Sequence, residues 1–260
     1  MQPFGEDTRQ NSSAGDAGDR RWEQLAPGVL RRRLPQWDAT VGAVSVEGSD
    51  GGDGGVLLID AGSSLREGAE IRADVRARLG NRVTRVVLTH PHFDHVFGTA
   101  VFSGAEVYAA VGTAELLSRS AEVLRDDAVA NGLLEDEAAE AADVLVRPHH
   151  AVSGQLTLDL GGGREAVLVN VGPAHTEHDL AVLVPGSPDV VFCGDLVEES
   201  GTPQAGPDAH PSRWPAALDR LLALGGEDAV YVPGHGAVVD AEFVRAQREE
   251  LAHRFASYGM

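Results

Sequence analysis

Side chains that commonly bind metals are concentrated in one short stretch, which reads Thr-His-Pro-His-Phe-Asp-His from residue 89 to residue 95. Side chains alternate along extended backbone, so His90, His92 and Asp94 can project to one side, whereas His95 needs a turn to join them. The apolar and β-branched run just before them predicts a strand that ends in a ligand-bearing loop. Neutral imidazole suits zinc and iron, and the single carboxylate offers an oxygen ligand for a second ion.

Three further motifs carry possible ligands later in the chain, each after a short apolar run. They are Gly-Pro-Ala-His-Thr with His175, Phe-Cys-Gly-Asp-Leu with Asp195, and Val-Pro-Gly-His-Gly with His235. Together with the H-x-H-x-D-H pattern, and in this order, they resemble the signature of the metallo-β-lactamase superfamily of metallohydrolases. The resemblance extends from about Gly28 to the C-terminus.

The resemblance implies two metal sites and a role for each motif residue. It assigns His90, His92 and His175 to the first metal, Asp94, His95 and His235 to the second, and Asp195 to the second metal or to a bridge between both. The implied cofactors are two divalent ions, Zn²⁺ first, with Fe or Mn as alternatives. The nucleophile would be a hydroxide that bridges the metals, and Asp94 is the candidate catalytic residue that orients it or receives a proton.

Four other residues are candidates for supporting roles. Asp60 and Asp179 are candidate carboxylates that fix the tautomer of a ligating imidazole, and the alternatives are a turn residue and a loop residue. His178, three residues after a ligand, is a candidate for the rim of the site. Glu198 is a candidate pocket residue: β-lactamases of the superfamily have a Lys there that grips the substrate carboxylate, and a Cys in place of Asp195. Hydrolysis of β-lactams is therefore not expected.

Composition limits the expected partners and compartment. The formal net charge of -19 repels phosphate backbones and anionic membrane surfaces, so we expect a small-molecule substrate and neither nucleic acid nor membrane as partner. All 21 basic residues are Arg, which excludes lysine-based covalent catalysis. The polar residues 1–21 lack a signal segment and predict a disordered tail. With Cys193 as the only cysteine, we expect a cytoplasmic protein without an internal disulfide.

Hydrophobic periodicity predicts two successive blocks in which strands are followed by helices. The expected strands are residues 28–33, 41–46, 55–59, 83–88, 106–109, 155–158, 166–170, 181–184, 190–193 and 229–232. The expected helices are residues 64–79, begun by a capping box at Ser64 and Glu67, 114–146 with a break near 131–132, 214–225 and 241–255. This order predicts an α+β protein, the four-layer αββα sandwich that the resemblance also implies, with residues 22–260 as one domain.

These observations give one leading hypothesis and two alternatives. The first is a binuclear zinc hydrolase acting on a small ester, thioester, lactone or amide, with the Gly- and Pro-rich segment 197–211 as one pocket wall. The second, also by resemblance, is a sulfur dioxygenase-like oxidoreductase with a single iron at His90, His92 or His175 and Asp195. The third is a metal-stabilised binding protein without turnover. The complete second ligand set favours the hydrolase, and the oligomeric state stays open.

Overall fold

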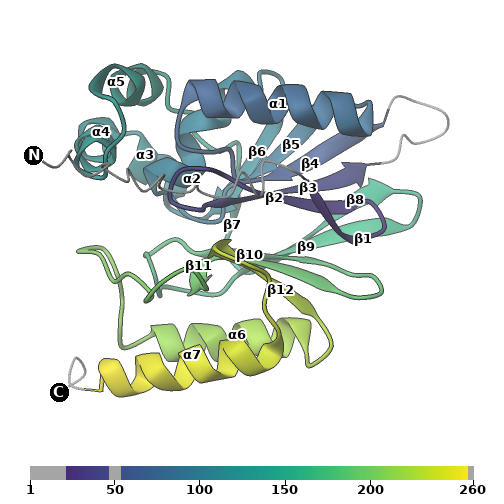
Figure 1. The fold of residues 1–260 in the computed structure, drawn as a ribbon, viewed down its shortest axis with the longest axis vertical. Helices are drawn as coiled ribbons and strands as arrows, with labels where there is room; N and C mark the ends of the chain where they lie inside the picture. Colours follow the sequence, from purple (N-terminus) through teal and green to yellow (C-terminus); the bar gives the residue numbers. More distant parts are fainter. Residues whose placement is uncertain (1–21, 47–53, 257–260) are drawn as a thin grey trace, which may run out of the picture.

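Two β-sheets lie face to face at the centre of the protein, and helices cover the outer face of each sheet (Figure 1). The computed structural model describes residues 22–46 and 54–256. The tail predicted for residues 1–21 therefore lies outside the described residues. The order of the layers confirms the predicted α+β fold, a four-layer αββα sandwich.

The larger sheet has seven strands in chain order. They are β1 (Glu23–Ala26), β2 (Val29–Arg33), β3 (Thr40–Val46), β4 (Gly55–Ile59), β5 (Val83–Val87), β6 (Glu106–Ala110) and β7 (His150–Val152). Strands β1 to β4 pair antiparallel, and β4 to β7 pair parallel. Parallel neighbours need crossover connections. The helices in these connections cover the outer face: α1 (Leu65–Leu79), α2 (Phe93–Val96), the 3₁₀ helix η2 (Phe97–Val101), α3 (Thr113–Leu117), α4 (Ala121–Ala130) and α5 (Glu135–Asp143).

The smaller sheet has five strands in the order β12-β11-β10-β9-β8. They are β8 (Gln155–Gly161), β9 (Arg164–Asn170), β10 (Leu180–Val184), β11 (Val190–Glu198) and β12 (Val230–His235). The first four pair antiparallel, and β12 joins β11 in parallel after the crossover helix α6 (Trp214–Gly225). Helix α6 and helix α7 (Ala241–Arg254) cover the outer face of this sheet (Figure 1).

Apolar side chains fill the spaces between the layers. Leu57 and Phe192, from different sheets, belong to the buried cluster between the two sheets. Ile71 of α1 and Trp214 of α6 belong to the clusters that attach the helices to the outer faces. All three clusters consist of apolar side chains, so residues other than the metal ligands supply the core of the scaffold.

The structure corrects several predictions of local structure. Asp94 and His95 lie in the short helix α2, not in an irregular loop. The segment predicted as one helix with one break forms three helices, α3, α4 and α5, because Leu117 and Leu124 enter the core from separate helices. Strand β11 continues to Glu198, so Asp195 lies within a strand and not after it.

Two smaller differences concern helix capping and short strands. Ser64 caps α1 as predicted, accepting a hydrogen bond from the backbone N–H of Glu67 at 3.2 Å. The Glu67 carboxylate, however, accepts from the backbone N–H of Ser63 at 2.9 Å, so the reciprocal bond of a capping box is made one residue earlier. Strands β1 and β7, of four and three residues, were not predicted because such short runs carry little periodicity.

Candidate metal centre

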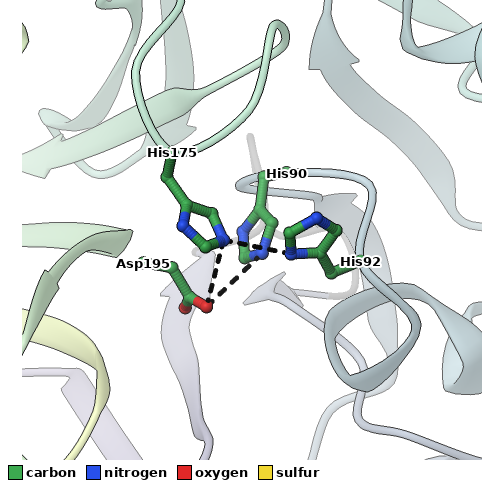
Figure 2. Close-up of side chains that lie close together, drawn as sticks. All are labelled: His90, His92, His175 and Asp195. Carbon is green, nitrogen blue, oxygen red and sulfur yellow. Dashed lines mark hydrogen bonds and ion pairs between the residues drawn. The ribbon is translucent and has the colours of Figure 1, made fainter. Parts of the chain in front are cut away.

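The seven predicted metal ligands come from four segments of the chain and converge on one place. Two groups of potential ligand atoms form there, each with all of its atoms within 4.8 Å of one another. The first group is His90, His92, His175 and Asp195, shown in Figure 2, and the second is Asp94, His95 and His235. The two groups match the division that the sequence motifs suggested, except that Asp195 is grouped with the first.

Asp195 lies between the two groups. Its Oδ2 atom is 3.4 Å from Nε2 of His175 in the first group and 3.2 Å from Nε2 of His235 in the second. Its Oδ1 atom is 3.2 Å from Nε2 of His95. One carboxylate therefore faces both groups, which is the position that a bridging ligand requires.

Two glycines of the motifs allow this close approach. A Cβ atom at Gly234 would overlap with Oδ1 of Asp195 on the neighbouring strand. Gly194 has a positive φ of 54°, and a Cβ atom there would lie 2.8 Å from the side chain of Thr89. The glycines before Asp195 and His235 thus bring strands β11 and β12 and the end of β5 together at the site.

The chemistry of these side chains fits divalent metal ions. The buried atom Nε2 of His90 has no hydrogen-bond partner among the described residues. Nε2 of His95 and Oδ1 of Asp195 are 3.2 Å apart, but their geometry is not that of a hydrogen bond, so they too lack a partner there. Buried polar atoms without partners are costly unless something else satisfies them. Imidazole and carboxylate atoms that face a common centre are the ligands that zinc and related ions take. The cluster is therefore suited to hold metal.

In each of the five imidazoles, the ring nitrogen that points away from the cluster has a polar partner. This contact fixes the orientation of the ring and leaves the other nitrogen for a metal. The partners are Thr89 Oγ1 for His90, Asp208 Oδ2 for His92, Asp60 Oδ2 for His95, the Gln204 carbonyl for His175 and the Trp37 carbonyl for His235. These five distances lie between 2.7 and 3.1 Å.

The carboxylates of the cluster also favour a positive charge beside them. Burial lowers the pKa of His175 to about 4, so this ring is neutral, the form that binds metal. Burial opposes protonation of His235 as well, but the nearby carboxylates of Asp195 and Asp94 outweigh it and raise the pKa of His235 to about 10. Without a metal, His235 is therefore protonated, and its positive charge takes the place of the charge that a bound cation would supply.

Asp60 acts as the sequence suggested, and it is also a turn residue. Its φ of 59° is in the left-handed region, which is uncommon for a residue other than glycine. In this conformation its carboxylate accepts from the backbone N–H and the hydroxyl of Thr89 at 2.8 Å each and lies 2.9 Å from Nδ1 of His95. Asp60 is thus both the predicted turn residue and the predicted carboxylate that orients the imidazole of His95.

Asp179 positions a ligand through the backbone and not through an imidazole. Its buried carboxylate accepts from the backbone N–H groups of Ala174 and Thr176 and from the Thr176 hydroxyl, at 2.8 to 3.1 Å. These groups flank His175 on both sides. Of the two roles predicted for Asp179, the structure shows the loop residue and not the carboxylate that fixes an imidazole tautomer: its hydrogen bonds hold the loop that carries His175.

His178 does not line the main pocket, which corrects its predicted place at the rim of the site. It lies against Gly112 and lines a neighbouring cavity of about 210 Å³ together with Asp208 and His210. Its backbone N–H donates to the Thr176 hydroxyl at 3.0 Å, so it belongs to the structure of the loop.

The main pocket, of about 410 Å³, opens onto the candidate metal ligands. Glu198 lines it, as predicted, and its Oε1 atom accepts from the backbone N–H of Gln204 at 3.0 Å. Burial, with the nearby charge of Asp195, raises the pKa of Glu198 to about 7. Residues Ser200 and Gln204 to Gly206 line the same pocket, in agreement with the predicted wall of segment 197–211.

Sequence reasoning missed Asp208, whose carboxylate lies 3.1 Å from Nε2 of His92. The two residues are 116 positions apart, and Asp208 is in an irregular segment without any motif of its own. Only its position in the predicted pocket-wall segment 197–211 could have drawn attention to it.

We expect Asp208→Asn to weaken metal binding about 10- to 100-fold, because a carboxylate that holds a ligating imidazole also increases its basicity. Competition with a chromogenic chelator measures this effect without any substrate. The control is Asp228→Asn, which removes an equal charge at an exposed position that does not line the pocket. Equal metal affinity in both variants would show that Asp208 has no part in the site.

Comparison with known proteins gives a consistent result. A family model described as the metallo-beta-lactamase superfamily matches residues 45–235. The type 2 metallo-beta-lactamase of Bacillus cereus is 25% identical over 190 residues, which cover 72% of this chain and 64% of that protein. Metallo-beta-lactamase IND-1 of Chryseobacterium indologenes is 23% identical over 185 residues, which cover 70% of this chain and 67% of that protein. The match thus spans less than two thirds of the Bacillus relative.

Solved structures resemble this one over most of the chain. A metallo-beta-lactamase from Pontibacter korlensis has a TM-score of 0.67 and 22% identity, covering 89% of this chain and 98% of that one. The metallo-beta-lactamase FIM-1 from Pseudomonas aeruginosa, solved in a mono-zinc form, has a TM-score of 0.65 and 21% identity, covering 91% and 96%. At these identities the structural likeness establishes the fold.

Proposed function

The chain belongs to the metallo-β-lactamase superfamily, and from this premise we propose that it is a zinc-dependent hydrolase of a small ester, thioester, lactone or amide. The observation that carries the proposal is the pair of ligand groups that share Asp195. Such a pair suits two ions, and two ions suit a hydrolysis in which water is the nucleophile.

When bound, zinc would supply a hydroxide near neutral pH and would polarise the carbonyl of the substrate. The protein's own residues prepare the place for this chemistry. Asp60 and the Trp37 carbonyl hold His95 and His235 in fixed orientations. Asp94, 3.4 Å from Nε2 of His235 through its Oδ2 atom, is the candidate to orient the attacking water or to receive its proton.

In the described part of the chain, no serine, threonine or cysteine of the pocket is hydrogen-bonded to an imidazole. Cys193 is fully buried in the smaller sheet, and burial raises the pKa of its thiol far above the usual range. Ser200, which lines the pocket, has no imidazole partner among the hydrogen bonds of the described residues. Water is therefore the nucleophile that this site favours.

The iron-dependent alternative remains a second candidate because His90, His92, His175 and Asp195 form a complete group on their own. A mononuclear site would leave Asp94, His95 and His235 without a role. The Nδ1 atoms of His95 and His235 are nevertheless each held by an acceptor, Asp60 and the Trp37 carbonyl, as they would be in metal ligands. Both sets are equally prepared for metal, and this favours the binuclear hydrolase.

The proposal is tested with metal-free protein, prepared by chelation and assayed on a panel of small esters, thioesters, lactones and amides. We expect no turnover without metal and recovery on addition of Zn²⁺. Recovery with Fe²⁺ alone, together with oxygen uptake on a persulfide, would favour the oxidoreductase. Hydrolysis that chelation leaves unchanged would contradict a metal-dependent mechanism. Absence of turnover on the whole panel at full metal occupancy would favour a binding protein.

We expect β-lactams to be poor substrates, although several relatives are β-lactamases by name. The carboxylate that penicillins and carbapenems carry would enter a pocket that Glu198 lines. Because the pKa of Glu198 is raised to about 7, its carboxylate is ionised above that pH, and like charges then weaken binding. Glu198→Lys should raise any residual β-lactam turnover, and Glu198→Gln, which removes the charge without reversing it, is the matched comparison. Efficient penicillin or carbapenem hydrolysis by the unmodified protein would overturn this expectation.

A further inference from the structure

One wall of the main pocket combines aromatic rings with a carboxylate. The ring of Trp37, from the β2–β3 connection, meets the ring of Phe93 edge to face with centroids 5.2 Å apart. The indole N–H of Trp37 donates to the backbone carbonyl of Asn131 at 3.2 Å. The Asn131 amide in turn donates to Oδ1 of Asp127 at 3.1 Å. All four residues line the pocket, so a tryptophan and a carboxylate are tied together beside the metal centre.

The carboxylate of Asp127 is not neutralised by an ion pair in the described part of the chain. Its neighbour Asp126 pairs with Arg125 at 2.9 Å and does not line the pocket. Among residues 22–46 and 54–256, no Arg lines the pocket, and the sequence contains no Lys. Asp127 therefore adds to the pocket wall a negative charge beyond that of the metal ligands.

Asp127 has one role in the helix itself: the amide of Asn131, the C-cap of α4, donates to its carbonyl at 2.9 Å and to its Oδ1 atom at 3.1 Å. It lies in the last turn of α4, which ends at Ala130, and a carboxylate in the last turn interacts unfavourably with the helix dipole. That turn contains no basic residue that would offset this cost. The negative charge of Asp127 is thus placed where the helix dipole disfavours it, and it lines the pocket.

We propose that the pocket selects substrates that carry an ammonium group on the arm away from the bond that is cleaved. In this arrangement the carbonyl lies at the metal centre, while the ammonium group lies against the Trp37 ring and the Asp127 carboxylate. A cation is attracted by the face of a tryptophan and by an unpaired carboxylate, and quaternary ammonium groups are bound in this way. The inference rests on the proposed hydrolase function and names its substrate class.

The test compares two esters that differ only in charge: a choline ester and the corresponding 3,3-dimethylbutyl ester, in which carbon replaces the nitrogen. We expect the metal-loaded protein to favour the choline ester about tenfold in kcat/KM, the size expected for one nearby carboxylate and one ring. This ratio should fall as salt is added, because exposed charges are screened. An ester with a carboxylate on the same arm should be the poorest of the three.

Variants assign the preference to this wall. Asp127→Asn should reduce the choline-to-neutral ratio at least about threefold, because the attraction of one charge is lost. Asp126→Asn is the control for net charge: it removes a carboxylate one residue away, which pairs with Arg125 and lies outside the pocket, and it should keep the ratio. Equal ratios in wild type and Asp127→Asn, or a preference for the neutral ester, would overturn the inference.

A binding measurement separates this inference from the hydrolase proposal. Calorimetry compares choline with 3,3-dimethyl-1-butanol on metal-loaded wild type, Asp127→Asn and Asp126→Asn. If neither ester is hydrolysed, the proposal of ester hydrolysis is wrong. Tighter binding of choline that only Asp127→Asn weakens would still support an ammonium site at Trp37 and Asp127. If both esters are hydrolysed at equal rates and choline does not bind more tightly, the ammonium site is wrong and the hydrolase proposal is retained.

Discussion

The Asp195→Asn protein is expected to bind one metal ion in place of two and to lose more than about 100-fold in turnover. The carboxylate of Asp195 faces both ligand groups, with Oδ2 3.4 Å from His175 and 3.2 Å from His235. An amide of the same shape is neutral and holds two cations poorly. The loss should therefore fall on one ion and leave the fold intact.

Metal content after gel filtration, measured beside wild type and Asp228→Asn, checks this result. Circular dichroism establishes that the variant is folded. If Asp195→Asn keeps two ions and normal turnover, Asp195 is only a structural residue of β11, and the binuclear mechanism fails.

His92→Ala is expected to lower turnover by several orders of magnitude, because it removes a ligand of the first metal and also the partner of Asp208. His92 is only partly buried, and it lies outside the three apolar clusters, so the variant should fold. His253→Ala, at an exposed position of α7, is the control for loss of an imidazole. A near-normal rate in His92→Ala when metal is limiting would exclude this residue as a ligand.

The architecture could be predicted because its signals are local. Apolar runs separated by glycine-rich turns mark the strands, and a four-layer sandwich is the arrangement that buries two blocks of strands followed by helices. The break near Asn131 was recognisable for the same reason. The break between α3 and α4 was not, because only the separate burial of Leu117 and Leu124 shows it.

The ligand residues could be predicted because the motifs keep them at fixed spacing next to strands. The residues that hydrogen-bond to these ligands are harder to predict from the sequence, because they come close to the ligands only in the folded chain. Asp208 reaches His92 across 116 positions, and the Trp37 carbonyl reaches His235 across 198. Neither contact leaves a periodic or compositional trace. Asp60 was found because it directly follows a strand, where side chains commonly enter sites.

The supporting residues show where sequence position alone misleads. His178 is three residues from His175, yet the turn held by Asp179 directs it into a neighbouring cavity. Asp179 itself holds backbone groups and not a ring. Separation along the chain does not fix direction in a loop, because each residue there has its own backbone angles.

The proposed binuclear hydrolase requires that the seven side chains hold two ions and that hydrolysis depends on both. Titration of metal-free protein with Zn²⁺, following bound metal and hydrolysis of a small ester in the same samples, tests it most directly. We predict two equivalents bound and activity that reaches its maximum only as the second is added. Full activity at less than one equivalent, or no dependence of hydrolysis on zinc, would contradict the account.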